Sequence, residues 1–313
     1  MLLIRGLANL HKQRSPCVAT IGAFDGMHLG HQAVLQQVKD AAAQRGVASA
    51  VILFEPQPKE YFAPHLATPR LMQLRDKVAF LQSFGIDLVV CLRFNAALAA
   101  LPAEDFVQQV LVDGLHIQHV IIGDDFRFGQ NRQGNFALLE QLGKQYSYTV
   151  QDTQTLLLAN KRASSSRVRD AVLQADFVLA KQLLGREYTL QGRVQHGQKL
   201  GRTLGFPTIN LRLKHNMVVH GIYAVTVSGL TDQPLYGAAS VGTRPTVQGH
   251  SRLLEVYCFD YAGDAYGKLV EVAFHHKVRD EQDFASLAEL TTAMQRDVGQ
   301  IKQHDFVVIP YHL

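Results

Sequence analysis

Residues 20–31 read TIGAFDGMHLGH, and they connect an apolar run to a segment with helical spacing. The run from Cys17 to Ala23 is typical of a buried strand. Gly22 and Gly26 then allow a tight turn, because glycine adopts backbone conformations that other residues avoid. Beyond the turn, apolar side chains recur at helical spacing over residues 34–42. We therefore predict a strand, a glycine-rich turn and a helix that begins at the end of this stretch.

Strand and helix patterns alternate through the first part of the chain. The predicted strands are Cys17–Ala23, Val47–Phe54, Leu88–Leu92 and His119–Ile122. The predicted helices lie over residues 34–42, 71–81 and 103–112. Alternating units of this kind form an α/β domain, a parallel sheet with helices on both faces. Ligands bind such sheets at the carboxyl ends of the strands.

The pattern changes near Gly185, where short β-rich runs divided by glycines begin. These runs are Tyr188–Val194, Val218–Val227, Leu235–Val241, Leu253–Phe259 and Leu269–Phe274. Many short strands joined by glycine turns are typical of a small barrel or sandwich, and here one helix over residues 284–301 follows them. We place the boundary at Leu184–Glu187 and predict two domains, residues 1–185 and 186–313.

The charge balance argues against a polyanion partner. The chain has 31 Lys and Arg against 27 Asp and Glu, a net charge of +4. The predicted domains share the excess, with 18 basic and 15 acidic residues in 1–185, and 13 and 12 in 186–313. Nucleic-acid-binding proteins usually concentrate their basic residues in a patch. We therefore expect no nucleic-acid partner.

Cysteine usage and hydropathy favour a cytoplasmic protein. Cys17, Cys91 and Cys258 are far apart in the sequence and form no CxxC pair, which argues against a disulfide framework. No apolar run approaches the ~20 residues that span a bilayer. The first residues also lack the apolar core and cleavage site of a signal peptide. We expect a cytoplasmic protein with no membrane partner.

Two histidines stand where the first predicted helix begins. The N-terminus of a helix offers free N–H groups and a positive dipole end, which attract phosphate. Solvent-facing polar residues and a weak zinc site are the alternatives for this pair. The strand, glycine turn and HxGH together resemble the phosphate-binding signature of the HxGH nucleotidyltransferase superfamily. The resemblance implies catalytic roles for His28 and His31, and nucleotide-binding roles for Gly22, Phe24, Asp25 and Gly30.

The segment ASSSRVR, at residues 163–169, precedes another predicted helix. Its hydroxyl and guanidinium groups suit the outer phosphates and a departing pyrophosphate, whereas serines at a helix start are also common as caps. The segment resembles the Ser-Ser-Thr-x-x-Arg phosphate clamp of the superfamily, with Ser166 in place of threonine. The resemblance implies that phosphate is bound by Ser164, Ser165, Ser166, Arg167 and Arg169.

Two loops after predicted strands resemble the flavin adenylyltransferase branch of the superfamily. One reads GDDFRFG over residues 123–129, and the other reads FEPQP over residues 54–58. In that branch these loops shape the nucleotide and flavin pocket, although many relatives have asparagine where this chain has Asp125. Core packing is the alternative for Phe126 and Phe128. The flavin-binding residues that the resemblance implies here are Phe54, Pro56, Pro58, Asp125, Phe126, Arg127 and Phe128.

A glycine-rich run in the second predicted domain reads GRTLGFPTINL over residues 201–211. Thr208 and Asn210 project from one face of a strand, because side chains alternate with period two, and their oxygen atoms suit Mg²⁺ bound to ATP phosphates. A P-loop is absent, and a Gly-Pro turn is the alternative. The run resembles the riboflavin kinase signature, with Ile209 in place of a common alanine. The nucleotide-binding residues so implied are Gly201, Arg202, Gly205, Pro207, Thr208 and Asn210, with Thr208 and Asn210 also as metal ligands.

Glu255 is the candidate general base. It alternates with apolar neighbours in the run Leu253–Phe259, so its carboxylate can face the interior of a barrel. A carboxylate near an attacking hydroxyl accepts its proton during phosphoryl transfer. An outward-facing carboxylate is the alternative, and the riboflavin kinase resemblance favours the base. The same resemblance implies that Arg279 and Glu281 contact the flavin.

The two blocks of motifs together resemble the prokaryotic bifunctional riboflavin kinase/FAD synthetase family. The resemblance implies a Rossmann-like adenylyltransferase domain at 1–185 and an antiparallel β-barrel riboflavin kinase domain at 186–313. It implies that FMN forms from riboflavin and ATP, and that FMN and ATP then give FAD and pyrophosphate. Mg²⁺ would accompany ATP, FMN and FAD would be intermediate and product, and the chain would be a monomer or a weak oligomer.

Two other functions remain open from the sequence. The chain would be a nucleotidyltransferase for a different phosphorylated metabolite if the barrel were only a binding module. Alternatively, the barrel would be an RNA-binding element, which predicts clustered Lys and Arg with exposed aromatic residues. The small charge excess of residues 186–313 weighs against the second function. ATP-dependent phosphorylation by that domain would exclude the first.

Overall fold

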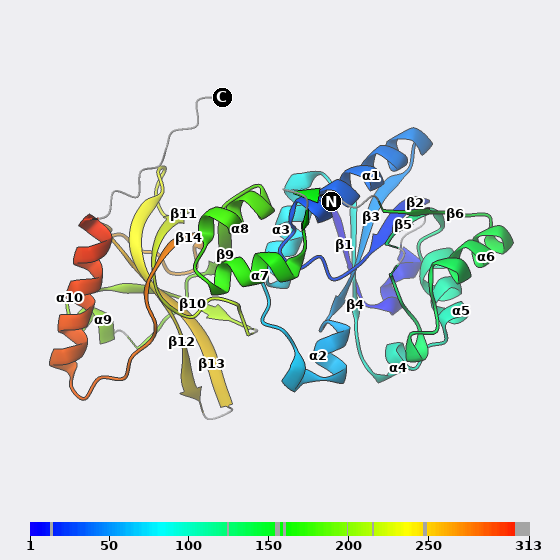
Figure 1. Cartoon of the computed structure of the whole chain (residues 1–313). Helices are drawn as coiled ribbons and strands as arrows, with labels where there is room; N and C mark the ends of the chain where they lie inside the picture. The colour runs from blue at the N-terminus through cyan, green and yellow to red at the C-terminus, as the bar shows by residue number, and fades with distance from the viewer. Residues whose placement is uncertain are drawn as a thin grey trace. The chain divides into compact units, whose positions relative to one another are not determined.

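The chain divides into two compact units. The computed structural model describes residues 1–12, 15–123, 125–153, 157–158, 161–198, 200–214, 216–246 and 249–303. The first unit contains Met1–Thr68 and Lys77–Ser164, and the second contains Pro69–Asp76 and Ser165–Leu313 (Figure 1). Helices α7 (Ser165–Leu173) and α8 (Phe177–Leu184) therefore belong to the second unit, although they precede the boundary predicted at Leu184–Glu187.

The first unit is built on a six-stranded sheet in which all paired strands are parallel. Its strand order is β1-β4-β3-β2-β5-β6. The strands are β1 (Leu2–Arg5), β2 (Cys17–Ile21), β3 (Ala48–Glu55), β4 (Leu88–Arg93), β5 (Ile117–Ile122) and β6 (Thr149–Asp152). The predicted parallel sheet is confirmed, and β1 and β6 are two edge strands that the sequence pattern does not predict.

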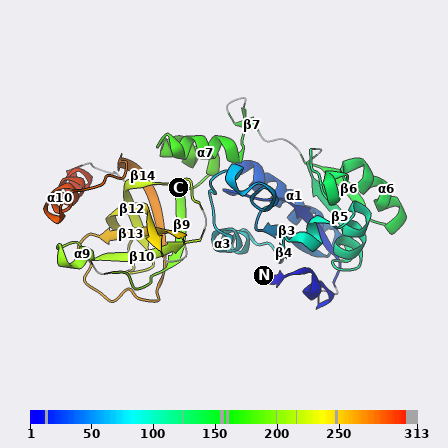
Figure 2. The ribbon, with the colours of Figure 1, turned by 90° about the horizontal axis from the view of Figure 1, so that it is seen from below.

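Helices cover both faces of this sheet (Figures 1 and 2). Ala19 of β2 packs on one face with Val107 and Leu139. The next strand residue back, Val18, packs on the opposite face with Val38, as the alternation of strand side chains requires. The helices of this part of the chain are α1 (Leu29–Arg45), α2 (Pro58–Phe62), α3 (Leu74–Phe84), α4 (Ala96–Ala99), α5 (Ala103–Phe106) and α6 (Phe136–Tyr146). The segment Val107–Val112 continues α5 with wider, π-type turns.

The strand order reverses between β2 and β5. The chain passes from β2 to β3 and β4 on one side of the sheet, and returns to β5 and β6 on the other. Ligands of open α/β sheets bind at such a switch point, outside the carboxyl ends of the strands. The loop at residues 22–28 follows β2, and the loop at residues 123–129 follows β5. The topology thus brings these two predicted ligand loops together at the carboxyl ends of the neighbouring strands β2 and β5.

The second unit contains an antiparallel six-stranded sheet with the order β10-β13-β12-β11-β14-β9. The strands are β9 (Tyr188–Arg193), β10 (Thr208–Leu213), β11 (Gly221–Ser228), β12 (Leu235–Thr246), β13 (Gly249–Cys258) and β14 (Leu269–Arg279). Its two edges meet just beyond β9, where the Gln195 N–H donates to the Asn210 carbonyl at 2.9 Å. Helices α9 (Leu200–Thr203) and α10 (Leu287–Gln303) complete this part (Figure 1). The predicted antiparallel barrel with a terminal helix is confirmed.

A segment from the N-terminal half, Pro69–Asp76, packs with the barrel. The Arg70 N–H donates to the Asn216 carbonyl at 2.7 Å. The Asp76 carboxylate accepts hydrogen bonds from the backbone N–H groups of Gln73 and Gln191, the latter 115 positions away in the sequence. Burial raises the pKa of Asp76 to about 6. The sequence pattern does not predict this insertion, because nothing local distinguishes a segment whose partners are so distant.

Candidate active sites

The loop after β2 has an unusual backbone. Phe24 and Met27 have φ of 47°, and Gly26 has φ of 87°, so that three residues of one short loop are left-handed. Non-glycine residues adopt this region at an energetic cost, and they do so mostly where the surroundings hold them. Met27 is completely buried and Asp25 is 5% exposed. The loop is therefore packed into the first unit and presents a fixed shape to the start of α1.

His28 caps the N-terminus of α1. Its Nδ1 accepts a hydrogen bond from the backbone N–H of His31 at 3.3 Å, which places the proton of the neutral ring on Nε2. The two imidazole rings are stacked, with centroids 3.7 Å apart. The pair predicted from the sequence is thus one unit at the positive end of a helix, and each ring can donate one hydrogen bond to an anion.

His31 is held in its neutral form. Its Nδ1 is buried and has no hydrogen-bond partner among the described residues. Burial lowers the pKa of His31 well below its usual value, and electrostatic interactions with His28, Lys77 and Arg162 lower it further. A neutral ring at this helix start is a hydrogen-bond donor to phosphate rather than a source of net charge. This arrangement does not resemble a zinc site, and the described residues contain no cluster of three His, Cys, Asp or Glu that fits a metal ion.

Gly30 leaves room for the His28 ring. A Cβ at this position would lie 3.1 Å from the His28 ring atoms and 3.1 Å from the Ala163 carbonyl oxygen. The same distances show that Ala163, and with it the start of the predicted serine clamp, lies beside the HxGH segment. Ser164 belongs to this unit, whereas Ser165, Ser166, Arg167 and Arg169 lie on α7 of the second unit.

For the adenylyl transfer to FMN that the HxGH resemblance implies, Gly30→Ala is expected to slow the reaction roughly tenfold, because displacement by a few tenths of an ångström misaligns His28. Riboflavin phosphorylation should stay within twofold of the wild-type rate, since its proposed site lies in the other unit. Both rates are measured on one preparation, with FMN supplied for the first and riboflavin for the second. An unchanged adenylyl-transfer rate would show that the fit of glycine against His28 has no catalytic role.

Aromatic side chains gather at the carboxyl ends of β3, β4 and β5. The Phe54 ring lies 5.9 Å from Phe94 and 6.4 Å from Phe106, and Phe106 lies 5.5 Å from Phe128. Phe128 is part of the core of the first unit, and Phe126 stacks on it at 5.6 Å. Core packing therefore accounts for Phe128 by itself. Phe128 is linked to Phe54 through the Phe106 ring, so that the aromatic side chains form a continuous row. The sequence does not identify Phe94 and Phe106 as members of this row.

The other loop residues predicted to bind flavin range from half-buried to exposed. Pro56 lies between β3 and α2, and Pro58 is the first residue of α2. Asp125 and Arg127 are exposed, and the Arg127 guanidinium donates to the Phe126 carbonyl at 2.8 Å. Gly123 allows the Asp125 side chain to approach, because a Cβ there would lie 2.9 Å from an Asp125 carboxylate oxygen.

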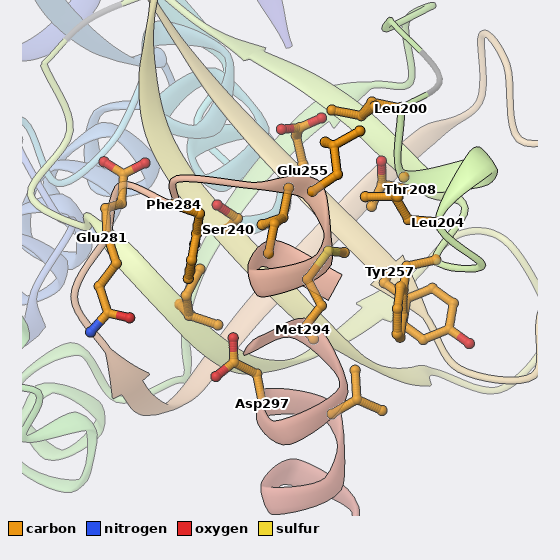
Figure 3. Close-up of a pocket in the computed structure, with 18 of the residues that line it drawn as sticks. Leu200, Leu204, Thr208, Ser240, Glu255, Tyr257, Glu281, Phe284, Met294 and Asp297 are labelled. Carbon is orange, nitrogen blue, oxygen red and sulfur yellow. The ribbon is translucent and has the colours of Figure 1, made fainter. Parts of the chain in front are cut away.

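The second unit contains a cavity of about 590 Å³ on the side of the barrel that faces α10. Its floor is formed by strands and its rim by α9, by the loop after β14 and by α10 (Figure 3). The polar residues that line it include Thr208, Ser240, Glu255, Arg279, Glu281 and Asp297. Apolar side chains such as Phe284 and Met294 face them. A cavity of this size, in which apolar side chains face several polar groups, suits a small aromatic or nucleotide ligand.

Thr208, Asn210 and Glu255 share one face of the barrel sheet. Thr208 and Asn210 are two positions apart on β10, and Asn210 is directly opposite Glu255 of β13. Directly paired residues point to the same side of a sheet. Asn210 is 6% exposed, and its side-chain oxygen has no hydrogen-bond partner among the described residues. A buried amide oxygen without a partner is costly unless a ligand satisfies it, which suits the predicted metal-ligand role.

Glycines within and just before the predicted kinase signature keep the surroundings of Asn210 open. A Cβ at Gly197 would lie 2.6 Å from both amide heteroatoms of Asn210. Gly201 has no room for a side chain against the Phe206 carbonyl, and Gly205 has φ of 86° in the turn between α9 and β10. Arg202 and Pro207 of the same run are exposed.

Arg279 is held by α10. Its guanidinium makes a two-pronged ion pair with Asp297, with the shortest contact at 2.7 Å, and lies 5.6 Å from the centre of the Phe284 ring. Asp297 is 4% exposed. Burial raises the pKa of the nearby Glu281, while the charges of His220 and Arg252 oppose that rise. The sequence identifies Arg279 and Glu281 as candidates. It does not identify Asp297, because this residue belongs to no recognisable motif.

Comparison with known proteins gives the same division as the motifs. Residues 10–167 match the family model described as FAD synthetase, and residues 184–304 match the model described as riboflavin kinase. The chain is 48% identical over 301 residues to the bifunctional riboflavin kinase/FMN adenylyltransferase of Pseudomonas fluorescens, with 96% of each chain covered. It is 46% identical over 299 residues to the protein of that description from Escherichia coli strain K12, with 95% and 96% covered.

A solved structure also resembles the whole chain. It is a crystal structure described as a macrolide-efflux protein from Streptococcus pneumoniae, with a TM-score of 0.74 and 27% sequence identity. The match covers 97% of this chain and 100% of that one. Among the described residues of this chain, we find no helix long and apolar enough to cross a membrane. The two family models and the near-complete coverage by close relatives agree, and the chain belongs to the family of bifunctional riboflavin kinase/FMN adenylyltransferases.

Proposed function

We propose that this chain makes FAD in two steps, with riboflavin kinase activity in the barrel and FMN adenylyltransferase activity in the parallel-sheet domain. The observation that carries the proposal is the alignment of Thr208, Asn210 and Glu255 on one face of the barrel sheet, together with a histidine pair at a helix start in the other unit. We assign the first activity to residues 186–313 and the second to residues 1–185. The match of residues 184–304 to the riboflavin kinase model argues against a barrel that only binds a ligand or RNA.

In the first step, the terminal ribityl hydroxyl of riboflavin attacks the γ-phosphorus of ATP. The O–P bond to ADP breaks, FMN forms, and Glu255 accepts the proton of the hydroxyl. Glu255 lines the cavity and is half-buried, so that it reaches a ligand there while water is partly excluded. The apolar side chains of Phe284 and Met294 on the rim suit the flavin ring. No covalent protein intermediate is needed for this step, since positioning and electrostatics suffice.

Mg²⁺ fits beside Thr208 and Asn210. The buried, unsatisfied oxygen of Asn210 and the hydroxyl of Thr208 are hard oxygen ligands on one strand face. When bound with ATP, the ion would offset negative charge on the phosphates. Thr208 and Asn210 would then fix the nucleotide opposite Glu255, since Asn210 and Glu255 are paired across the sheet.

In the second step, a phosphate oxygen of FMN attacks the α-phosphorus of another ATP, and pyrophosphate leaves. His28 and His31 donate hydrogen bonds to the phosphate chain, at the positive end of α1. These donors stabilise charge that accumulates on the phosphates in the transition state. Ser164 adjoins this site through Ala163, and the half-buried rings of Phe54, Phe94 and Phe126 offer a surface for the flavin. FMN and FAD are thus intermediate and product rather than resident groups.

The proposal is tested by following riboflavin, FMN and FAD over time in the presence of ATP and Mg²⁺. We expect FMN to rise and then fall as FAD accumulates. FMN formation without any FAD would overturn the second activity, and FAD from supplied FMN without any FMN from riboflavin would overturn the first. Size-exclusion chromatography of the same sample tests the further expectation of a monomer or weak oligomer, and cell fractionation tests the cytoplasmic location.

Gly197→Ala is expected to lower kcat/KM for ATP in riboflavin phosphorylation roughly 100-fold, because a shift of about 1 Å in the Asn210 amide misplaces a metal ligand. The control is Gly299→Ala in α10, where an added Cβ meets nothing within 4 Å and alanine favours the helix. The control should retain both activities. If Gly197→Ala also keeps its kcat/KM for ATP at every Mg²⁺ concentration, Asn210 does not bind the metal-bound nucleotide.

A further inference from the structure

Lys77 is a buried cation that contacts the loop after β2. It lies on α3 and is 3% exposed. Its ammonium donates a hydrogen bond of 2.7 Å to the carbonyl of Ala23, 54 positions earlier in the chain. Ala23 directly precedes the left-handed residue Phe24, in the loop that leads to His28. Lys77 therefore holds the HxGH loop by its backbone, from an element outside that motif.

The charge of Lys77 is close to the histidine pair. It is one of the positive charges that depress the pKa of His31, and the Phe24 ring beside its contact point lies 4.9 Å from the His31 ring. His31 has a buried Nδ1 with no hydrogen-bond partner among the described residues. One small region of the first unit thus contains the unsatisfied Nδ1 of His31, the start of α1 and the Lys77 ammonium.

A lysine is an unusual residue for so buried a position. Removing an ammonium group from water costs several kcal/mol unless partners and nearby negative charge compensate. The hydrogen bond to the Ala23 carbonyl needs only a neutral donor, which an amide side chain also supplies. A positive charge is more useful than a neutral donor where a polyanion binds, because charges interact strongly in a partly buried site.

We propose that Lys77 is a positioning residue for adenylyl transfer, which fixes the HxGH loop through the Ala23 carbonyl and attracts the ATP triphosphate with its charge. The inference rests on the proposed adenylyltransferase activity and adds a residue that neither phosphate motif contains. Lys77 acts through the loop and through its field, while His28 and His31 make the direct contacts. The hydrogen bond and the charge are separable functions of one side chain, and they predict different consequences for different substitutions.

The test uses Lys77→Arg, Lys77→Gln and Lys77→Met in the full-length enzyme. Arginine keeps both the charge and a donor, glutamine keeps a donor without charge, and methionine keeps neither. We expect kcat/KM for ATP in FMN adenylylation to fall about 100-fold in Lys77→Met, as for a displaced catalytic loop, about tenfold in Lys77→Gln, and least in Lys77→Arg. Competitive inhibition by inorganic pyrophosphate should weaken in the same order.

The kinase activity and the thermal midpoint distinguish this role from a general effect on folding. Riboflavin phosphorylation should stay within twofold in all three variants, because its proposed residues are in the other unit. The proposal is overturned if pyrophosphate inhibits Lys77→Gln and Lys77→Met as strongly as wild type, or if both activities and the thermal midpoint fall together. Failure of the proposed activity itself would be seen separately, as a wild-type enzyme that makes no FAD.

Discussion

Glu255→Gln is expected to lower the rate of riboflavin phosphorylation roughly 10³-fold, within the range of a lost general base. Glutamine has nearly the shape of glutamate, so the cavity and its strand pairing remain, but its amide cannot accept the hydroxyl proton. Glu255 is half-buried on β13, lines the cavity and is paired with Asn210. In the proposed arrangement, the carboxylate would meet the hydroxyl of a flavin whose ring lies against Phe284, with the nucleotide held by the neighbouring strand.

The measurement is FMN formation from riboflavin under saturating ATP and Mg²⁺. Conversion of supplied FMN to FAD should remain within twofold of wild type, because the residues proposed for that reaction lie within residues 1–185 and none of them is on the barrel strands. Glu140→Gln, a substitution of an exposed glutamate on α6, is the matched control and should leave both rates unchanged. A folded Glu255→Gln enzyme that loses both activities would contradict the division between the units, and one that loses neither would exclude Glu255 as the base.

The parts of the fold that the sequence predicts are those with local signals. Strands β2, β3, β4 and β5 are covered on both faces and read as continuous apolar runs. The edge strands β1 and β6 have mostly exposed or half-buried residues, so their sequences carry no such run. The pattern also starts a helix at Leu71, whereas α3 begins at Leu74. Leu71 is buried but lies in the segment that packs with the second unit. Apolar spacing alone does not distinguish a residue of a helix from a buried residue just before it.

The sites show the same limit. His28 and Thr208 lie in short motifs whose spacing has chemical meaning, and the riboflavin kinase resemblance singles out Glu255, so the sequence proposes all three as site residues. Lys77 and Asp297 have no motif, and each matters through a partner on another element: Ala23 for Lys77 and Arg279 for Asp297. Such long-range contacts depend on the packing of whole elements. The contact between Lys77 and Ala23 joins residues 54 positions apart. The sequence therefore indicates the HxGH loop but not the lysine that supports it.

The combined substitution His28→Ala and His31→Ala is expected to stop the enzyme at FMN, with adenylyl transfer reduced about 10³-fold or more. Removal of one donor that stabilises transition-state charge costs about 10² to 10³ in rate, and here two donors are lost together. FMN should accumulate at the wild-type rate when riboflavin is the substrate. Liquid chromatography of FMN and FAD measures both effects in one reaction.

A single substitution separates the two functions of His28. Its Nδ1 caps α1 by accepting the His31 N–H, and loss of a cap by itself costs about 1 kcal/mol of stability. Asparagine is among the best capping residues, yet its side chain is too short to place a donor where the imidazole Nε2–H lies. His28→Asn should therefore keep the thermal midpoint and the kinase activity while FAD synthesis falls at least 100-fold. Wild-type FAD production from supplied FMN in this variant would show that His28 serves the helix alone, and the phosphate-binding role would then have to belong to His31 and the serine clamp.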